Sequence, residues 1–214
     1  DAVRPDIMDG TYREPVSDGS GRDRNNVRAA LQLLGEAGWR QDGGVLKNAA
    51  GEPFRFEILV YTREDERLAL AYARTLRLVG IGAEVRSVDA SLYNDLMLNF
   101  DFDMARVYWS TSLSPGNEQT NRWSSAAADV PGTLNYLGVR EPAVDALIGT
   151  LLAERDAARF RDVVRALDRV LLSGAYVVPL FNTPEQWLAY SSKLGRPEKQ
   201  SMSGVEWETW WVKP

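Results

Sequence analysis

The chain has 214 residues, and its 30 acidic and 25 basic residues give a formal net charge of −5. Hydrophobic residues make up 44% of it, which is typical of a globular protein with a sizeable core. The acidic balance argues against nucleic acid as a partner. The sequence contains no cysteine and no histidine, which excludes disulfides, thiolate metal sites and the commonest general base. Carboxylate chemistry, a Ser–Lys pair and an all-oxygen metal site stay open, but no tight motif marks any of them, so we expect no metal and no cofactor.

The first 23 residues are rich in Asp, Gly, Pro and Ser, which predicts a loop or linker. The apolar spacing over 24–37 predicts a helix, with Asp23 as its N-cap and Gly38 as its left-handed stop. Apolar residues that alternate with charged ones at the start of 54–60 then predict a strand that enters a buried sheet.

Strands and helices continue to alternate after this first strand. The pattern predicts a helix over 68–79, a strand over 83–88, a helix over 91–99 and a strand over 103–109. This order favours an α/β fold with a mostly parallel sheet and right-handed crossovers. Ligands usually approach such a sheet at the carboxyl ends of its strands, which makes Trp109 a candidate site residue.

A long polar segment from 110 to 138 is the unusual feature of the sequence, and only 117–124 within it predicts a short helix. Loops of this length in a compact domain are commonly functional, and the interleaved aromatic residues argue for order. Aromatic, hydroxyl, amide, carboxylate and guanidinium groups here suit a cleft that binds a small solute. The candidate ligand-binding residues are Trp109, Ser110, Thr111, Ser112, Asn117, Glu118, Arg122, Asn135 and Tyr136.

Each of these candidates also has a structural interpretation. Trp109 could be a core residue, Asn117, Glu118 and Arg122 could decorate a solvated helix, and Asn135 could be turn chemistry. Beyond the loop, the sequence predicts a helical hairpin over 142–171, strands over 176–181 and 186–190, and a tail rich in tryptophan.

Several motifs, in this order and spacing, resemble the family 5 extracellular solute-binding proteins, and most closely the branch of periplasmic oligopeptide and microcin receptors of ABC importers. The motifs are LLGEAGW at 33–39, SPGNE at 114–118, WSS at 123–125, NY at 135–136, PAVDALI at 142–148 and WW at 210–211. In the peptide-binding relatives an Asp follows the tryptophan equivalent to Trp109, whereas this chain has serine, threonine and leucine over 110–113. Glu118 is the substitute that remains for that carboxylate.

The resemblance implies a periplasmic-binding-protein-like type II lobe, with a mixed, mostly parallel sheet flanked by helices. It implies a loop from a missing N-terminal part over 1–23, a ligand-binding lobe over 24–180, and a segment over 181–214 that returns toward the other lobe. It also implies a monomeric periplasmic receptor, not an enzyme, which binds a peptide or other small solute and meets the membrane only through ABC permease subunits. The alternatives are a hydrolase that uses two carboxylates and a domain whose exposed tryptophans bind another protein.

Overall fold

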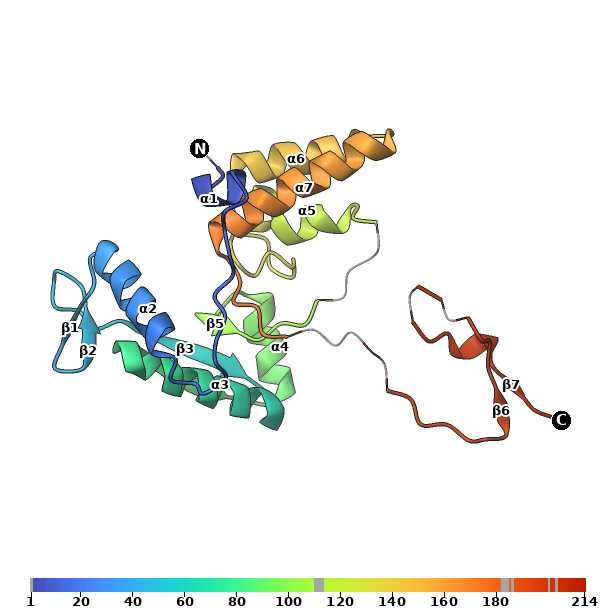
Figure 1. Ribbon diagram of the computed structural model, residues 1–214, viewed down its shortest axis with the longest axis horizontal. Coiled ribbons are helices and arrows are strands. Elements are labelled where there is room, and N and C mark those ends of the chain that lie inside the picture. The colour runs from blue at the N-terminus through green and yellow to red at the C-terminus, as the bar shows by residue number, and fades with distance from the viewer. Residues whose placement is uncertain (1, 110–113, 182–184, 186, 200, 203) are drawn as a thin grey trace. The chain divides into compact units, whose positions relative to one another are not determined.

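The computed structural model describes residues 2–109, 114–181, 185, 187–199, 201–202 and 204–214. The chain forms two compact units, Asp1–Tyr176 and Val177–Pro214 (Figure 1). The first unit ends close to the expected end of the binding lobe at residue 180. The assignment of 181–214 to a second lobe stays a prediction.

A three-stranded parallel sheet organises the first unit. Its central strand is β3 (Arg55–Val60), which lies between β4 (Gly82–Ser87) and β5 (Met104–Ala105). The predicted β-α-β-α-β order is therefore confirmed. β5 is shorter than the predicted strand 103–109, because the chain leaves the sheet after Ala105. The next residue, Arg106, forms an ion pair with a helix.

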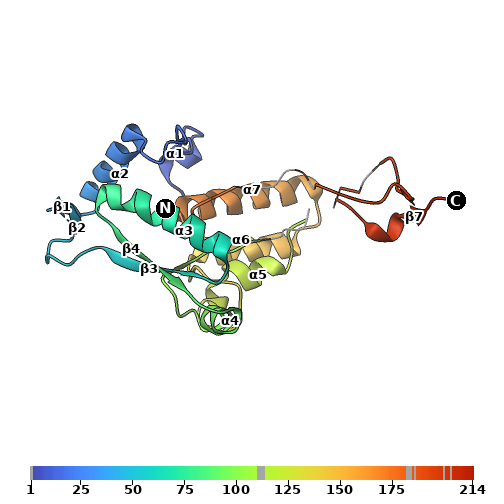
Figure 2. The same cartoon turned by 90° about the horizontal axis from the view of Figure 1, so that it is seen from below.

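Helices cover both faces of this sheet, as Figure 2 shows. Ile58 and Val60 pack against α3 (Arg63–Leu76). Leu59 points to the opposite face and packs against α4 (Ala90–Leu98). Because side chains alternate along a strand, the wholly apolar end of β3 supplies both cores at once.

The predicted first long helix is α2 (Arg24–Glu36), and Asp23 caps it by accepting hydrogen bonds from two backbone amides in its first turn. Gly38 has a φ of 90°, as expected of a left-handed stop. A hairpin that the sequence analysis did not predict follows, made of β1 (Arg40–Asp42) and β2 (Val45–Lys47). Its two-residue turn is formed by glycines with φ of 58° and 82°, which suits the right-handed twist of a hairpin.

A further core of the first unit, apart from the two on the faces of the sheet, is formed by helices. The hairpin of α6 (Pro142–Ala153) and α7 (Ala157–Gly174), which the sequence predicted, packs with α5 (Glu118–Trp123). The buried residues of this helical core are Trp123, Val139, Val144, Ile148, Leu151, Leu167 and Val170. Two short 3-10 helices, η1 (Arg77–Val79) and η2 (Ser125–Ala127), complete the elements of this unit.

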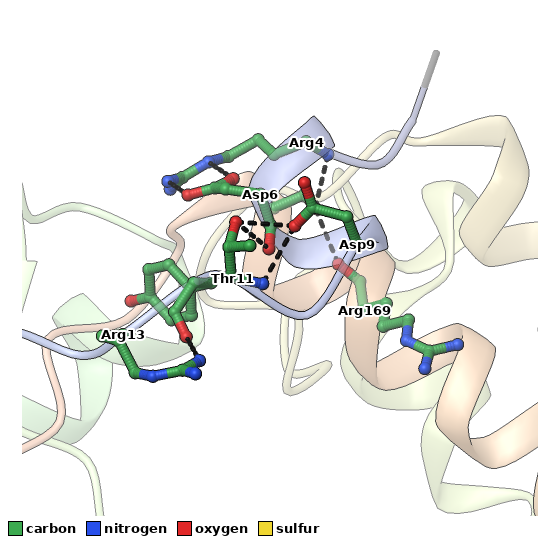
Figure 3. A network of polar contacts seen from close by, with 8 residues as sticks. Arg4, Asp6, Asp9, Thr11, Arg13 and Arg169 are labelled. Atoms are coloured by element: carbon green, nitrogen blue, oxygen red, sulfur yellow. Dashed lines mark hydrogen bonds and ion pairs between the residues drawn. The ribbon is translucent and has the colours of Figure 1, made fainter.

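The N-terminal segment is not wholly a loop, because it contains α1 (Pro5–Met8), which has a proline in its first turn. The backbone amide of Arg4 donates to Ser173 Oγ at 3.0 Å, and that hydroxyl donates to the carbonyl of Arg169 at 2.7 Å (Figure 3). Ile7 is buried. The segment is thus held against α7.

The second unit differs from its prediction. None of the described residues of 176–190 is in a strand, because none of them has a neighbouring strand to satisfy its backbone groups. Instead β6 (Leu194–Gly195) pairs with β7 (Trp211–Val212), and η3 (Trp207–Thr209) lies between them in sequence. The ring centroids of Tyr190 and Trp210 are 4.9 Å apart.

No helix within the described residues is long and apolar enough to span a membrane.

Candidate functional site

The carboxyl ends of three parallel strands meet at one edge of the sheet, and this edge carries exposed aromatic and cationic side chains. Tyr61 follows β3 and is 46% exposed, and Tyr108 follows β5 and is 78% exposed. Arg106 also follows β5, and 36% of its side chain is exposed. Parallel sheets bind their ligands at this edge, so the topology places a candidate binding surface here.

An ion pair fixes Arg106 at this edge. Its Nη1 lies 3.2 Å from Oδ1 of Asp65, whose side chain is only 6% exposed. Asp65 is placed by the first turn of α3, where Thr62 Oγ1 accepts the Asp65 backbone amide at 3.1 Å. Because a guanidinium has five N–H donors, Arg106 keeps further donors for a partner on its exposed side.

Tyr93 of α4 contacts both Arg106 and Tyr61 at the same edge. Its hydroxyl donates to the carbonyl of Arg106 at 3.0 Å, and its ring lies 4.5 Å from that of Tyr61. Burial, helped by the negative charge of Asp65, raises the pKa of Tyr93 from 10.0 to about 12. Tyr93 therefore stays protonated and acts as a positioning group.

Trp109 lies at the end of the same segment, as the sequence predicted. Its ring meets the ring of Trp123 edge to face, with 5.2 Å between the centroids, and packs on the helical core. Its buried Nε1 donates to no partner in the described structure. Trp109 thus ties the sheet edge to α5. Ser110, Thr111 and Ser112 lie outside the described residues.

The predicted short helix carries three of the candidate residues. Asn117 is exposed at the start of α5 and makes no side-chain capping bond. Glu118 Oε1 accepts the backbone amide of Gly116 at 3.0 Å and the side-chain amide of Gln119 at 3.2 Å. The Gly116 bond, with a smaller attraction from Arg122, lowers the pKa of Glu118. Glu118 is therefore occupied by its own loop, and ligand contact by these residues stays a prediction.

The last two candidates hold the loop together. Asn135 is 1% exposed. Its amide donates to the carbonyls of Ser124 and Val139 at 3.0 Å, and its Oδ1 accepts the Val139 amide at 2.9 Å. Tyr136 packs edge to face against Phe100 and Phe102. In this structure, the side chain of Asn135 faces the loop it closes and offers no exposed atom to a solute.

The carboxyl groups with a shifted pKa among the described residues are stabilised in their ionised form. No three carboxylates gather there as a metal site would require. The carboxyl groups whose pKa is shifted are all lowered, chiefly by hydrogen bonds, and they are Asp9, Asp18, Asp42, Glu118 and Glu154. A lowered pKa keeps an acid ionised, whereas a general acid needs a raised one.

Comparison with known proteins decides the family. The model of the bacterial extracellular solute-binding proteins, family 5 (middle region), matches residues 5–130. This chain belongs to that family. The expected resemblance is thereby confirmed, and the carboxyl edge of the sheet lies within the matched region.

Relatives of this family 5 chain include a putative binding protein of Brucella suis, which is 47% identical over 210 residues. The match covers 98% of this chain and 34% of that protein. A probable peptide-binding protein, YejA, of Agrobacterium fabrum is 40% identical over 213 residues, covering 99% of this chain and 35% of the relative. The chain therefore spans about a third of the length of the curated relatives it matches.

Solved structures confirm the fold. The oligopeptide-binding protein AppA of Bacillus subtilis, in complex with a nonapeptide, superposes with a TM-score of 0.62 at 23% identity, covering 70% of this chain and 30% of AppA. The expected type II periplasmic-binding-protein architecture is thus confirmed for this family 5 chain.

Sequence reasoning missed Tyr61, Asp65, Tyr93 and Arg106 as a group. They come from α3, α4 and the segments that follow β3 and β5, and no motif spacing connects them. One signal was present for Tyr61, because it directly follows the predicted strand 54–60 and the carboxyl ends of parallel strands share one edge. Arg106 lies inside the predicted strand 103–109, and it reaches the edge because β5 ends at Ala105.

Proposed function

We propose that this chain is one lobe of the solute-binding component of an ABC importer, which captures peptides or related small solutes and delivers them to a membrane permease. The observation that carries the proposal is an open carboxyl edge, with Tyr61 and Arg106 at the ends of adjacent parallel strands, in a chain of the family 5 receptors. The name and ligand of the relatives above support peptides as the solute class.

The edge has the groups that a peptide requires. An arginine fork pairs with a terminal carboxylate in two parallel hydrogen bonds. Aromatic rings such as Tyr61 and Trp109 provide flat surfaces for the peptide's apolar parts. The hydroxyl groups of Ser110, Thr111 and Ser112 complete the proposed site as hydrogen-bonding partners. A second lobe would close over the bound solute, which shifts the receptor toward its closed form.

The protein is proposed to act by binding alone, as a monomer on the periplasmic side of the membrane. The hydrolase alternative requires a carboxyl group with a raised pKa close to a second carboxylate, and turnover of glycoside or peptide substrates would support it. Because backbone hydrogen bonds and water would provide much of the affinity, selectivity among peptide side chains is expected to be low.

Isothermal titration calorimetry tests the site, with pooled di- to octapeptides and the longest natural form of the protein that contains this chain. Arg106→Gln removes the exposed fork and is expected to weaken peptide binding at least about tenfold. Arg140→Gln is the matched control, because Arg140 also pairs with one carboxylate and is half exposed, but on a distant loop position.

Unchanged affinity of Arg106→Gln would exclude the sheet edge as the site. Absence of heat with every peptide pool in the wild type would exclude peptides as the solute class while leaving family and fold intact.

A further inference from the structure

One exposed side of α3 carries arginines that the proposed solute site does not use. Arg63, Arg67, Leu70, Arg74 and Arg77 are all exposed, and together they are called the arginine stripe. At 3.6 residues per turn these five positions fall within about 80° of arc. They extend along about 21 Å of helix. The stripe is therefore a straight, narrow row of positive charge.

The acids at the start of α3 do not pair with the arginines of the stripe in the part of the chain that the structure describes. Within the described residues, none of its four guanidinium groups forms an ion pair or a side-chain hydrogen bond. Arg86, Arg106 and Arg140, in contrast, each pair with an acid. Glu64 and Glu66 lie in the first turn of α3, where they complement the helix dipole, on either side of the stripe. A net charge of −5 makes such a row unexpected.

The opposite side of α3 is already in use. Ala69 and Ala73 are buried, and Tyr72 and Leu76 pack against the sheet. Leu68 and Leu70 are exposed on α3 but lie on different sides of it, so the helix has no continuous spare apolar face to insert into a partner.

We propose that the arginine stripe docks the protein on an anionic phospholipid surface, with its guanidinium groups against lipid phosphates. The stripe has one apolar side chain, Leu70, and no aromatic one, whereas the core of a protein–protein interface is mostly apolar, although arginine itself is common there. Arginine forks match phosphate oxygens in pairs of hydrogen bonds. Glu64 and Glu66 flank the stripe and reduce its positive field, whereas acids more than about 8 Å away are screened at physiological ionic strength.

Vesicle co-sedimentation tests the proposal, with the longest natural form of the protein and vesicles of 30% phosphatidylglycerol in phosphatidylcholine. Each arginine near such a surface contributes about fivefold to the partition coefficient. Arg67→Glu with Arg74→Glu is expected to reduce binding by more than about twenty-fold. Binding is also expected to fall when salt is raised and to be absent with phosphatidylcholine alone.

The matched control is Arg159→Glu with Arg161→Glu, two exposed arginines of α7 that change the net charge equally. Retained binding of this control supports a local stripe. Equal loss in both variants would overturn it in favour of overall charge. No binding of the wild type to phosphatidylglycerol vesicles would also overturn it and would point to an acidic protein surface as the occupant.

Discussion

Two regions of the first unit are rich in polar and aromatic side chains, and they use them differently. In the loop between β5 and α6, Asn135 makes three hydrogen bonds to its own loop, and Ser125 makes two to Asp145. At the carboxyl edge of the sheet, Tyr61 is 46% exposed and the Arg106 side chain 36% exposed. Composition alone does not distinguish a polar segment whose hydrogen-bonding groups pair within the protein from one whose groups stay exposed. The topology distinguishes them, because parallel strands end together at one edge.

The largest expected effect comes from removing the side-chain amide of Asn135, which holds the loop together. Asn135→Leu would leave the buried Val139 amide and two carbonyls without partners. We expect the free energy of unfolding, measured by urea denaturation, to fall by about 3 kcal/mol. Asn117→Ala is the control, with a change below about 0.5 kcal/mol because Asn117 is exposed and makes no capping bond. A fall below about 1 kcal/mol for Asn135→Leu would mean that the loop is held by other contacts.

The edge itself rests on the pair of Asp65 and Arg106, 3.2 Å apart. Asp65→Asn is expected to lower the free energy of unfolding by about 1–2 kcal/mol, since Arg106 remains partly hydrated. Glu57→Gln, which breaks an exposed pair with Arg86, should cost less than about 0.5 kcal/mol. A double-mutant cycle with Arg106→Gln isolates the pair, and a coupling energy near zero would contradict its role in fixing the edge.

Tyr93 provides the subtlest test of the edge, because it acts through pH. Its pKa is raised to about 12 in the folded protein from 10.0. A raised pKa means that the folded state holds the proton more tightly, so the stabilisation is complete below pH 10 and is lost as pH rises toward 12. Tyr93→Phe should remove this part of the alkaline loss, measured as the free energy of unfolding at successive pH values. Parallel alkaline curves in wild type and variant would contradict the burial of the hydroxyl.

Sequence patterns predicted the first unit well where periodicity and caps coincide. The helix capped by Asp23 and the apolar end of β3 follow from local rules. The late strands over 176–190 were wrong, because β-propensity does not say whether a neighbouring strand exists. The position of Trp109 after the last parallel strand was predicted, and its role as a site residue stays a prediction. The pair of Asp65 and Arg106 was not predicted, because these residues meet across 41 positions of sequence that no motif links.

The fastening of α1 to α7 also sets an order of assembly. The Arg4–Ser173 hydrogen bond joins residues 169 positions apart. At about 5–20 residues per second, the ribosome needs roughly 8–35 s to make the chain between them. The sheet and its two covering helices can pair from the nascent chain during that interval, since their contacts are closer in sequence. The α1 segment thus finds its place only after α7, which is synthesised much later, has left the ribosome.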